Sequence, residues 1–213
     1  MNEEQTVVVV DDDPGVRDSL SMLLESVGLT HRLYATAKDF LADVDQIHSG
    51  CLVLEIRMPG MSGLELQSKL REHNIALPII FITGHGDINM AVKAMRLGAL
   101  DFITKPYHEQ ELLDRIHEAL EYENNSRKQL HEHHELVARI NSLSDREREV
   151  FERVAAGQAN KVIASDLGIS ERTVEVHRAQ AMRKLDARTL AEVVRIYLES
   201  QRPLFEPIIF SQA

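Results

Sequence analysis

The first half of the chain alternates short apolar runs with longer segments whose apolar residues recur at helical spacing. The runs cover residues 6–10, 31–34, 51–54, 78–83 and 100–104. Strands joined by crossover helices pair in parallel, and a parallel sheet needs helices on both of its faces. We therefore predict an α/β unit with a five-stranded, doubly wound parallel sheet in the strand order 2-1-3-4-5.

Length and composition are typical of two modest domains. The chain has 213 residues, and 44% of them are hydrophobic. Its one cysteine, Cys51, lies in an apolar run, which excludes an intramolecular disulfide and indicates a reducing compartment. The N-terminus lacks the features of a signal peptide, and no apolar run reaches the roughly 18 residues of a membrane span. We expect a cytoplasmic protein that does not enter a membrane.

The charges are distributed unevenly along the chain. The net charge is −10, but residues 1–124 hold 10 Lys and Arg against 21 Asp and Glu, whereas residues 142–213 hold 11 of each kind. Residues 170–190 have five basic side chains against three acidic ones. A local basic excess favours contacts with phosphate. The acidic total therefore does not exclude nucleic acid as a partner.

Residues 107–156 contain no proline or glycine and are predicted to begin with one long helix. Its seam positions follow a 3-4-3-4 spacing that includes Glu123 and Arg127. We interpret residues 124–141 as a semi-exposed linker helix that can pair with a second copy. The alternative is two helices that meet at Asn124-Asn125. The three histidines of the linker are interpreted as a solvated helix face rather than a metal site.

Acidic side chains follow two strands that are neighbours in the predicted sheet. Asp11 and Asp12 come directly after the first strand, and Glu55 ends the third. The three carboxylates are expected to converge at one edge of the sheet, and hard oxygen ligands of this kind suit Mg²⁺. Thr83 and Lys105 follow the next two strands, and the bond from Lys105 to its proline is a candidate cis peptide. The sequence thus predicts a phosphoryl-binding site with Mg²⁺ as cofactor.

The last third of the chain is helical by pattern. A capping box of Ser144 and Glu147 starts the first helix, and a glycine turn at residues 167–170 separates the second from the third. Four helices are predicted, at residues 145–156, 159–167, 171–185 and 188–200. This all-α unit fits a helix-turn-helix domain, in which the helix after the turn enters the major groove.

The third of these helices presents a face suited to reading DNA. Val174, Ala181 and Leu185 form its core side. Arginine and glutamine can read guanine and adenine, and small apolar side chains can contact the thymine methyl group. The outward face and its flanks hold Arg172, Thr173, Glu175, Val176, Ala179, Gln180 and Arg183.

Four motifs connect the first half to a known family. VVVVDDD, LEIRMPGMSG, FITGH and ITKP resemble the receiver domains of two-component response regulators, over roughly residues 4–123. The resemblance implies a flavodoxin-like receiver domain of residues 1–123 and a sensor histidine kinase as partner. It further implies that metal is held by Asp11, Asp12, residue 55 and the backbone carbonyl of Arg57, that residue 55 accepts the phosphoryl group, that Thr83 and Phe102 form a switch pair, and that Lys105 contacts the phosphoryl group.

The chain departs from the receiver pattern at the acceptor position, where Glu55 replaces the usual aspartate. Glutamate is longer by one methylene, about 1.5 Å of chain. Three interpretations stay open. The receiver is regulated without phosphorylation, Glu55 partly mimics the phosphorylated state by reaching toward Lys105, or the substitution was introduced for study.

The motif LSDREREVFERVAAGQANKVIASDLGISERTVEVHRAQAMRKL closely resembles the LuxR/FixJ class of four-helix DNA-binding domains, over roughly residues 142–200. The resemblance implies that Lys161 contacts phosphate and that Thr173, Glu175, Val176 and Arg178 lie at or near DNA. The helical wheel places Arg178 toward the core side, so we assign it to phosphate rather than to bases.

Together the two resemblances indicate a FixJ-like transcription factor that is not an enzyme. We expect it to bind double-stranded promoter DNA, to act with RNA polymerase, and to form a homodimer through the receiver and the linker helix. Residues 201–213 are an apolar C-terminal tail that we expect to pack on the last domain. Two other classes stay open, a protein-interaction module with a degenerate receiver and a metal-dependent phosphohydrolase.

Overall fold

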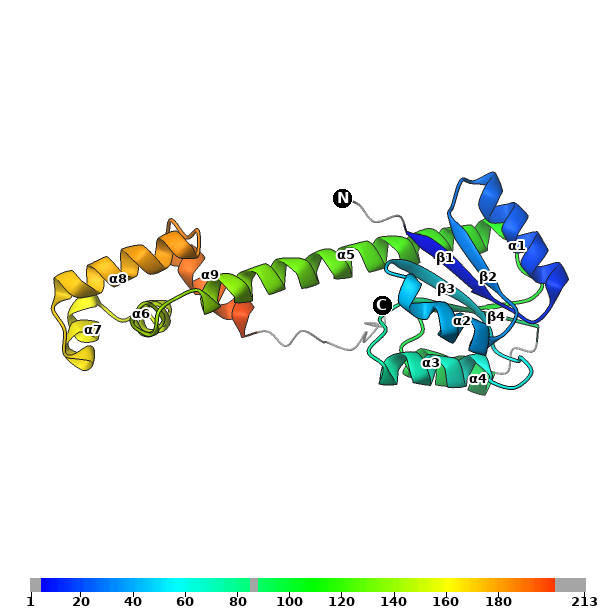
Figure 1. Cartoon of the computed structure of the whole chain (residues 1–213), viewed down its shortest axis with the longest axis horizontal. Helices are drawn as coiled ribbons and strands as arrows, with labels where there is room; N and C mark the ends of the chain where they lie inside the picture. The colour runs from blue at the N-terminus through cyan, green and yellow to red at the C-terminus, as the bar shows by residue number, and fades with distance from the viewer. Residues whose placement is uncertain (1–4, 85–87, 202–213) are drawn as a thin grey trace. The chain divides into compact units, whose positions relative to one another are not determined.

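The computed structural model describes residues 5–84 and 88–201, shown in Figure 1. Residues 202–213, nearly all of the apolar tail, lie outside the described residues, as does the expected packing of that tail. The chain divides into two compact units between Ser126 and Arg127. Across the described ranges, no helix is long and apolar enough to cross a membrane.

The first unit is built on a sheet of five parallel strands. The predicted doubly wound fold and the order β2-β1-β3-β4-β5 are confirmed. The side chains of the three central strands are almost entirely buried, because helices cover both faces of the sheet. The strands are β1 (Thr6–Val10), β2 (His31–Tyr34), β3 (Gly50–Glu55), β4 (Ile79–Thr83) and β5 (Asp101–Thr104).

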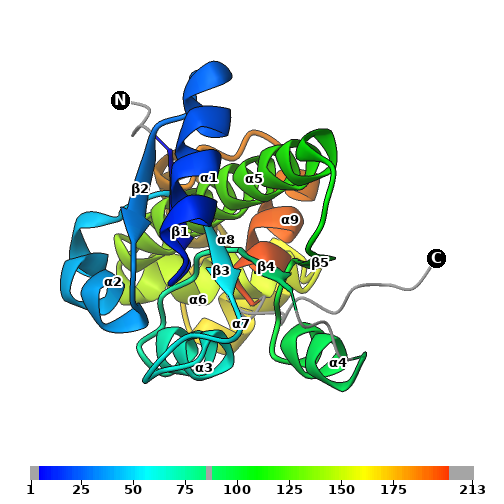
Figure 2. The same ribbon diagram turned by 90° about the vertical axis from the view of Figure 1, so that its right-hand side faces the viewer.

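Helices cover the sheet in two layers, which Figure 2 shows on opposite sides of the strands. Alternate residues of a strand point to opposite faces. Val7 and Val9 therefore pack in the layer of α1 and α5, whereas Val8 and Val10 pack in the layer of α2, α3 and α4. The helices are α1 (Pro14–Ser26), α2 (Ala37–Asp43), followed by a 3-10 turn (Val44–Gln46), α3 (Gly63–Glu72), α4 (Ile88–Arg96) and α5 (Glu109–Asn141).

α5 is one continuous helix of 33 residues, so the alternative of two helices meeting at Asn124-Asn125 is wrong. Its sequence contains no residue that interrupts a helix. The boundary between the two units falls inside this helix. Leu130 is exposed, but Leu136 and Ile140 are buried in the core of the second unit. Each end of α5 therefore belongs to a different hydrophobic core.

Glu123 is buried, with 7% of its surface exposed, and is not the semi-exposed seam position that the spacing indicates. Its carboxylate accepts hydrogen bonds from the Gln5 amide at 2.9 Å and the Ser49 hydroxyl at 2.8 Å. Gln5 also donates to the backbone carbonyl of Leu120. The partners come from segments ahead of β1 and β3, which helical periodicity does not reveal. Glu123 thus ties α5 to the first unit at the point where the two units divide.

The second unit is a small helical bundle around Phe151, Ile163, Val174 and Ile196. The predicted Ser144 capping box is confirmed, and the left-handed C-cap Gly168 makes the sharp turn between its second and third helices. The helices are α6 (Asp145–Ala155), α7 (Asn160–Leu167), α8 (Glu171–Lys184) and α9 (Leu190–Ser200). The predicted helix-turn-helix arrangement is formed by α7 and α8.

Removing the Glu123 carboxylate should destabilise the first unit. In Glu123→Ala, the buried Ser49 hydroxyl loses the acceptor that Glu123 provided, which costs about 1–3 kcal/mol for an unsatisfied group, and the half-buried Gln5 amide keeps only the Leu120 carbonyl. Urea unfolding followed by circular dichroism measures the loss. Glu121→Ala, at an exposed position of the same helix, is the control and should change stability by less than about 0.5 kcal/mol. Equal stability of the two variants would contradict the anchoring role.

Candidate functional site

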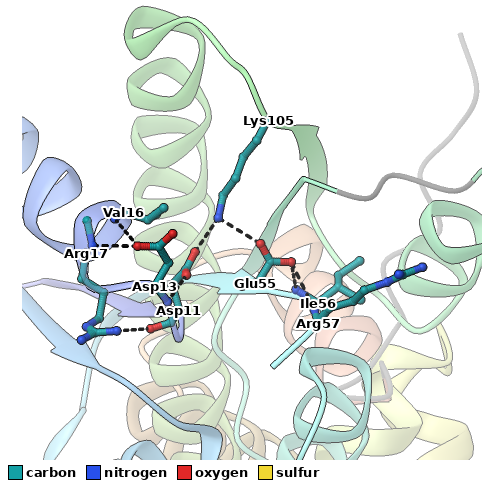
Figure 3. A network of polar contacts seen from close by, with 9 residues as sticks. Asp11, Asp13, Val16, Arg17, Glu55, Ile56, Arg57 and Lys105 are labelled. Atoms are coloured by element: carbon teal, nitrogen blue, oxygen red, sulfur yellow. Dashed lines mark hydrogen bonds and ion pairs between the residues drawn. The ribbon is translucent and has the colours of Figure 1, made fainter. Parts of the chain in front are cut away.

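Three charged side chains meet at the carboxyl edge of the sheet (Figure 3). Asp11 follows β1, Glu55 ends β3, and Lys105 follows β5. The Lys105 Nζ atom lies 2.6 Å from Asp11 Oδ2 and 2.9 Å from Glu55 Oε2, so one ammonium group bridges both carboxylates. The order of the strands places β1 beside β3, which brings Asp11 and Glu55 to the same place.

The Glu55 carboxylate is held at both oxygens. Oε1 accepts hydrogen bonds from the backbone N–H groups of Ile56, at 2.8 Å, and Arg57, at 3.2 Å. Oε2 accepts from Lys105, and only 7% of the residue is exposed. The start of α3 approaches closely, since a Cβ at Gly63 would lie 2.4 Å from the Glu55 carbonyl oxygen. The side chain is therefore fixed, with its carboxylate turned back toward its own backbone.

The charges in this pocket affect one another. Burial raises the pKa of the Asp11 carboxyl above its ordinary value, although the hydrogen bond from Lys105 acts in the opposite direction. Burial lowers the pKa of the Lys105 ammonium, but its hydrogen bonds to Asp11 and Glu55 outweigh that effect and leave the pKa raised. Lys105 is consequently a full cation at neutral pH. It supplies the positive charge that two crowded carboxylates need.

The loop after β1 is fixed by contacts that the sequence analysis did not identify. The Asp13 backbone N–H donates to Asp11 Oδ1 at 2.9 Å, and the Arg17 guanidinium donates to the Asp11 carbonyl at 2.7 Å. Asp13 itself caps α1, since its side chain accepts from the N–H groups of Gly15 and Val16. The DDDP spacing ahead of a helix favours an N-cap at Asp12 or Asp13, and the structure places the cap at Asp13. These bonds orient Asp11 toward the pocket.

The predicted convergence of three carboxylates is only partly observed. Asp12 is exposed, whereas Asp11 and Glu55 are buried and engaged with Lys105. Among the residues that the structure describes, no group of three or more His, Cys, Asp or Glu side chains is gathered closely enough to hold a metal. The donors are nevertheless hard oxygen atoms of the kind that Mg²⁺ prefers. The oxygen donors of this site therefore fit Mg²⁺ chemically, but the Lys105 ammonium group lies between the carboxylates of Asp11 and Glu55.

The remaining residues of the predicted receiver site lie around this pocket. Thr83 is buried at the end of β4, and its carbonyl accepts from the Lys105 N–H at 2.8 Å. Phe102 lies beside Phe81 in the β4–β5 register and packs partly buried against the core. The Lys105-Pro106 bond is cis, as predicted. Arg57 is exposed and contributes its N–H to Glu55.

In the second unit, most of the side chains assigned to DNA contact are open to solvent. Lys161 lies in the first turn of α7 and is exposed. On α8, the buried positions include Val174 and Ala181, as the wheel predicts. Exposed positions are Arg172, Glu175, Val176, Ala179 and Arg183, and half-buried ones are Thr173, Arg178 and Gln180.

Two basic side chains of α8 have partners inside the unit. Arg178 donates to the Asn160 side chain of α7 at 3.2 Å, consistent with its place toward the core side. Lys184, which contributes to the local basic excess of the sequence, lies 2.6 Å from the Glu147 carboxylate of the α6 capping box. Lys184 therefore joins α8 to α6, and its charge is compensated within the unit. The basic excess available to a partner is smaller than the sequence alone indicates.

The two units define a signal-receiver domain and a helix-turn-helix domain, and comparisons with known proteins agree. The model of the response regulator receiver domain matches residues 7–117, and that of bacterial regulatory proteins of the luxR family matches residues 141–197. TmoT of Ectopseudomonas mendocina, a response regulator protein, is 46% identical over 92% of this chain and 90% of its own length. The transcriptional regulatory protein FixJ of Rhizobium meliloti is 44% identical over 92% of this chain and 96% of its own length.

Solved structures give the same result. The response regulator StyR has a TM-score of 0.84 at 44% identity, covering 92% of this chain and all of its own. Full-length FixJ of B. japonicum has a TM-score of 0.59 at 40% identity, and the match covers 93% of this chain and 98% of the FixJ chain. The chain belongs to the response regulators that join a receiver domain to a LuxR-type DNA-binding domain. Regulators of this kind are transcription factors, so the chain is not an enzyme.

Proposed function

We propose that this transcription factor is controlled without phosphorylation of residue 55. The observation that supports the proposal is the hydrogen bond of 2.9 Å between Lys105 Nζ and Glu55 Oε2. A receiver lysine at this position contacts the phosphoryl group, and here the same ammonium contacts a carboxylate of the chain itself. Glu55 then acts as a partial mimic of the phosphorylated state, with Oε2 standing where Lys105 would meet a phosphoryl oxygen.

Glu55 is poorly placed to act as a nucleophile. Its added methylene moves the carboxylate by about 1.5 Å of chain. Both oxygens are occupied, Oε1 by two backbone N–H groups and Oε2 by Lys105. Transfer of a phosphoryl group depends on alignment with the acceptor, and a 1 Å misplacement can cost roughly 10²-fold in rate. These constraints favour signalling by some input other than phosphate on Glu55.

We propose Mg²⁺ as the cofactor of this pocket. The carboxylates of Asp11, Asp12 and Glu55 and the backbone carbonyl of Arg57 are the donors that we assign to it. When bound, the ion would supply two further positive charges at the acidic edge of the sheet. Lys105 already engages Asp11 and Glu55, so the ion and the ammonium compete for the same oxygen atoms. We therefore expect weaker Mg²⁺ binding than in a receiver with aspartate at residue 55.

For DNA recognition we propose that α8 enters the major groove with Arg172 and Arg183 toward base edges. Val176 and Ala179 would contact thymine methyl groups, with Gln180, Thr173 and Glu175 at the flanks. Lys161 and Arg178 are assigned to phosphate. Support comes from the exposure of both arginines and from the Asn160 contact that holds Arg178 at the side of α8.

The partners that we propose follow from the two domains. Double-stranded promoter DNA and RNA polymerase are the partners of the second unit. A sensor histidine kinase is the partner that a receiver implies, and with Glu55 it would bind the receiver without transferring phosphate to that residue. A homodimer would place two copies of α8 on two half-sites, through the receiver and residues 124–141 of the linker. Leu130 supports the linker contact, because it is 39% exposed on a helix whose other large apolar side chains are mostly buried.

The acceptor position gives a direct test of control without phosphorylation. We expect no labelling of the protein by acetyl phosphate in the presence of Mg²⁺, measured by intact mass. Glu55→Asp shortens the side chain and should restore labelling. Glu55→Ala should remain unlabelled and, if the mimic operates, should lower DNA affinity several-fold. Stoichiometric phosphorylation of the unaltered chain would refute the proposal.

The role of α8 can be tested by DNA titration at several salt concentrations. Arg172→Ala and Arg183→Ala should each weaken binding to the specific site by about 1–3 kcal/mol and relax base preference. Lys161→Ala should weaken binding to all sequences and reduce the salt slope by about one. Arg195→Ala, which removes an exposed arginine of α9, is the control. Loss of binding in the control alone would overturn the assignment of α8.

The linker contact can be tested by sedimentation of the full chain. Leu130→Asp places a charge on an exposed apolar position and should loosen the dimer and lower DNA affinity together. A second variant, Leu130→Asp with Val137→Asp, should enlarge both effects. The control is Gln129→Asp, which adds the same charge next to residue 130 but leaves the apolar Leu130 side chain in place. Equal dimer constants for Leu130→Asp and Gln129→Asp would exclude the linker as the interface.

A further inference from the structure

Gln67 of α3 has a buried side-chain amide whose oxygen has no donor. The residue is 3% exposed, and its Nε2 donates to the Ala94 carbonyl of α4 at 3.2 Å. Among the residues that the structure describes, no donor lies within hydrogen-bonding distance of its Oε1, which is also buried. Most buried polar groups of proteins have a partner, because an unsatisfied acceptor is unfavourable. Oε1 therefore marks a position that suits a donor.

The amide of Gln67 is held at the point where α4 ends. The Ala94 carbonyl also accepts from the Ala99 N–H at 3.0 Å, and the Gly98 N–H donates to the Met95 carbonyl at 2.9 Å. This pattern ends a helix through a left-handed glycine, and the φ angle of Gly98 is +89°. α3 and α4 lie on the same side of the sheet (Figure 2). The Gln67 amide thus ties α3 to the end of its neighbour.

A cavity of about 370 Å³ lies beside this amide, a size that is typical of small-molecule sites. We name it the α3–α4 cavity. Leu97, directly after α4, is half-buried and gives it an apolar wall. Arg71 and Glu72 are exposed at the end of α3, and no ion pair joins either charge to another described residue. The lining residues are Gln67, Ser68, Arg71, Glu72 and Leu97.

The lining offers partners for two opposite charges. The guanidinium of Arg71 can bind a carboxylate through two parallel hydrogen bonds. An ammonium group has three donors, and the Glu72 carboxylate and Gln67 Oε1 are both acceptors. The C-terminal ends of helices also attract cations, and both α3 and α4 end at this cavity. A ligand with only one charge would leave either Arg71 or Glu72 without a partner.

We propose that the α3–α4 cavity binds a free α-amino acid. Its carboxylate would lie on Arg71, its ammonium group on Glu72 and Gln67 Oε1, and its side chain against Leu97. A donor on Oε1 polarises the amide and strengthens the bond from Nε2 to the Ala94 carbonyl. Binding would therefore tighten the contact between α3 and the end of α4. The inference is independent of the proposed control at Glu55 and of the assignment of α8.

A nuclear magnetic resonance titration of the ¹⁵N-labelled full chain tests the proposal. The probes are L-alanine, L-leucine, L-phenylalanine and L-glutamine, each added alone. We expect at least one of them to shift the side-chain amide signals of Gln67 and the backbone signal of Gly98, with a Kd below about 1 mM. The amide derivative of that amino acid, which lacks the carboxylate, should bind at least tenfold more weakly. The acid without its amino group should be weakened to the same degree.

Two variants of the last turn of α3 form a matched pair. Arg71→Ala should weaken binding of the amino acid at least tenfold. Lys69→Ala removes the same charge from an exposed position that lines a separate groove between α2 and α3, so it should leave the Kd unchanged. Gln67→Met keeps a side chain of similar length without the amide and should also weaken binding. Circular dichroism of each variant checks that the receiver is folded.

Three outcomes would overturn the proposal. The first is the absence of any shift at Gln67 with all four amino acids up to about 10 mM, a concentration at which even weak sites are filled. The second is equal weakening by Arg71→Ala and Lys69→Ala, which would indicate a general charge effect rather than a site. In the third, the amide derivative binds as well as the amino acid itself, and the cavity would then be a site for simple amines.

Discussion

The ammonium group of Lys105 is the interaction on which the receiver pocket depends. Two buried carboxylates at one sheet edge repel each other unless a cation lies between them. Lys105 provides that cation from the loop after β5, and its backbone is fixed by the Thr83 carbonyl at the end of β4. The strand order, the buried faces of the sheet and the helix caps all serve to bring these groups together. The chain itself therefore supplies one of the two positive charges that would balance these carboxylates.

The fold was predictable because its determinants are periodic. Apolar runs of strand length, separated by helical stripes, specify a parallel sheet, and the capping box at Ser144 with the glycine turn at Gly168 specifies the helical unit. Asp11, Glu55 and Lys105 were predictable as neighbours, since each follows a strand at the same edge. The exposed face of α8 followed from the spacing of its buried residues.

The errors concern long-range polar contacts, which leave no periodic signal. Glu123 occupies a seam position by spacing, yet its burial depends on Gln5 and Ser49, more than 70 residues away in the chain. Lys184 looks like a free cation in the sequence, but Glu147 lies next to it once the bundle is folded. Asp11 and Asp12 are adjacent in sequence, but Asp11 is buried and Asp12 is exposed. The difference follows from the hydrogen bonds that Asp11 accepts from the Asp13 N–H and from Lys105.

The Glu55 side chain has a consequence for how such regulators diverge. Asp and Glu codons differ only in their third base, so a single transversion exchanges the two residues. The surrounding groups, Asp11, Thr83, Lys105 and the cis proline, are those of a receiver and need no change for that exchange. Under the control that we propose for Glu55, one point mutation would therefore move such a gene between two modes of regulation, with no other change in the pocket.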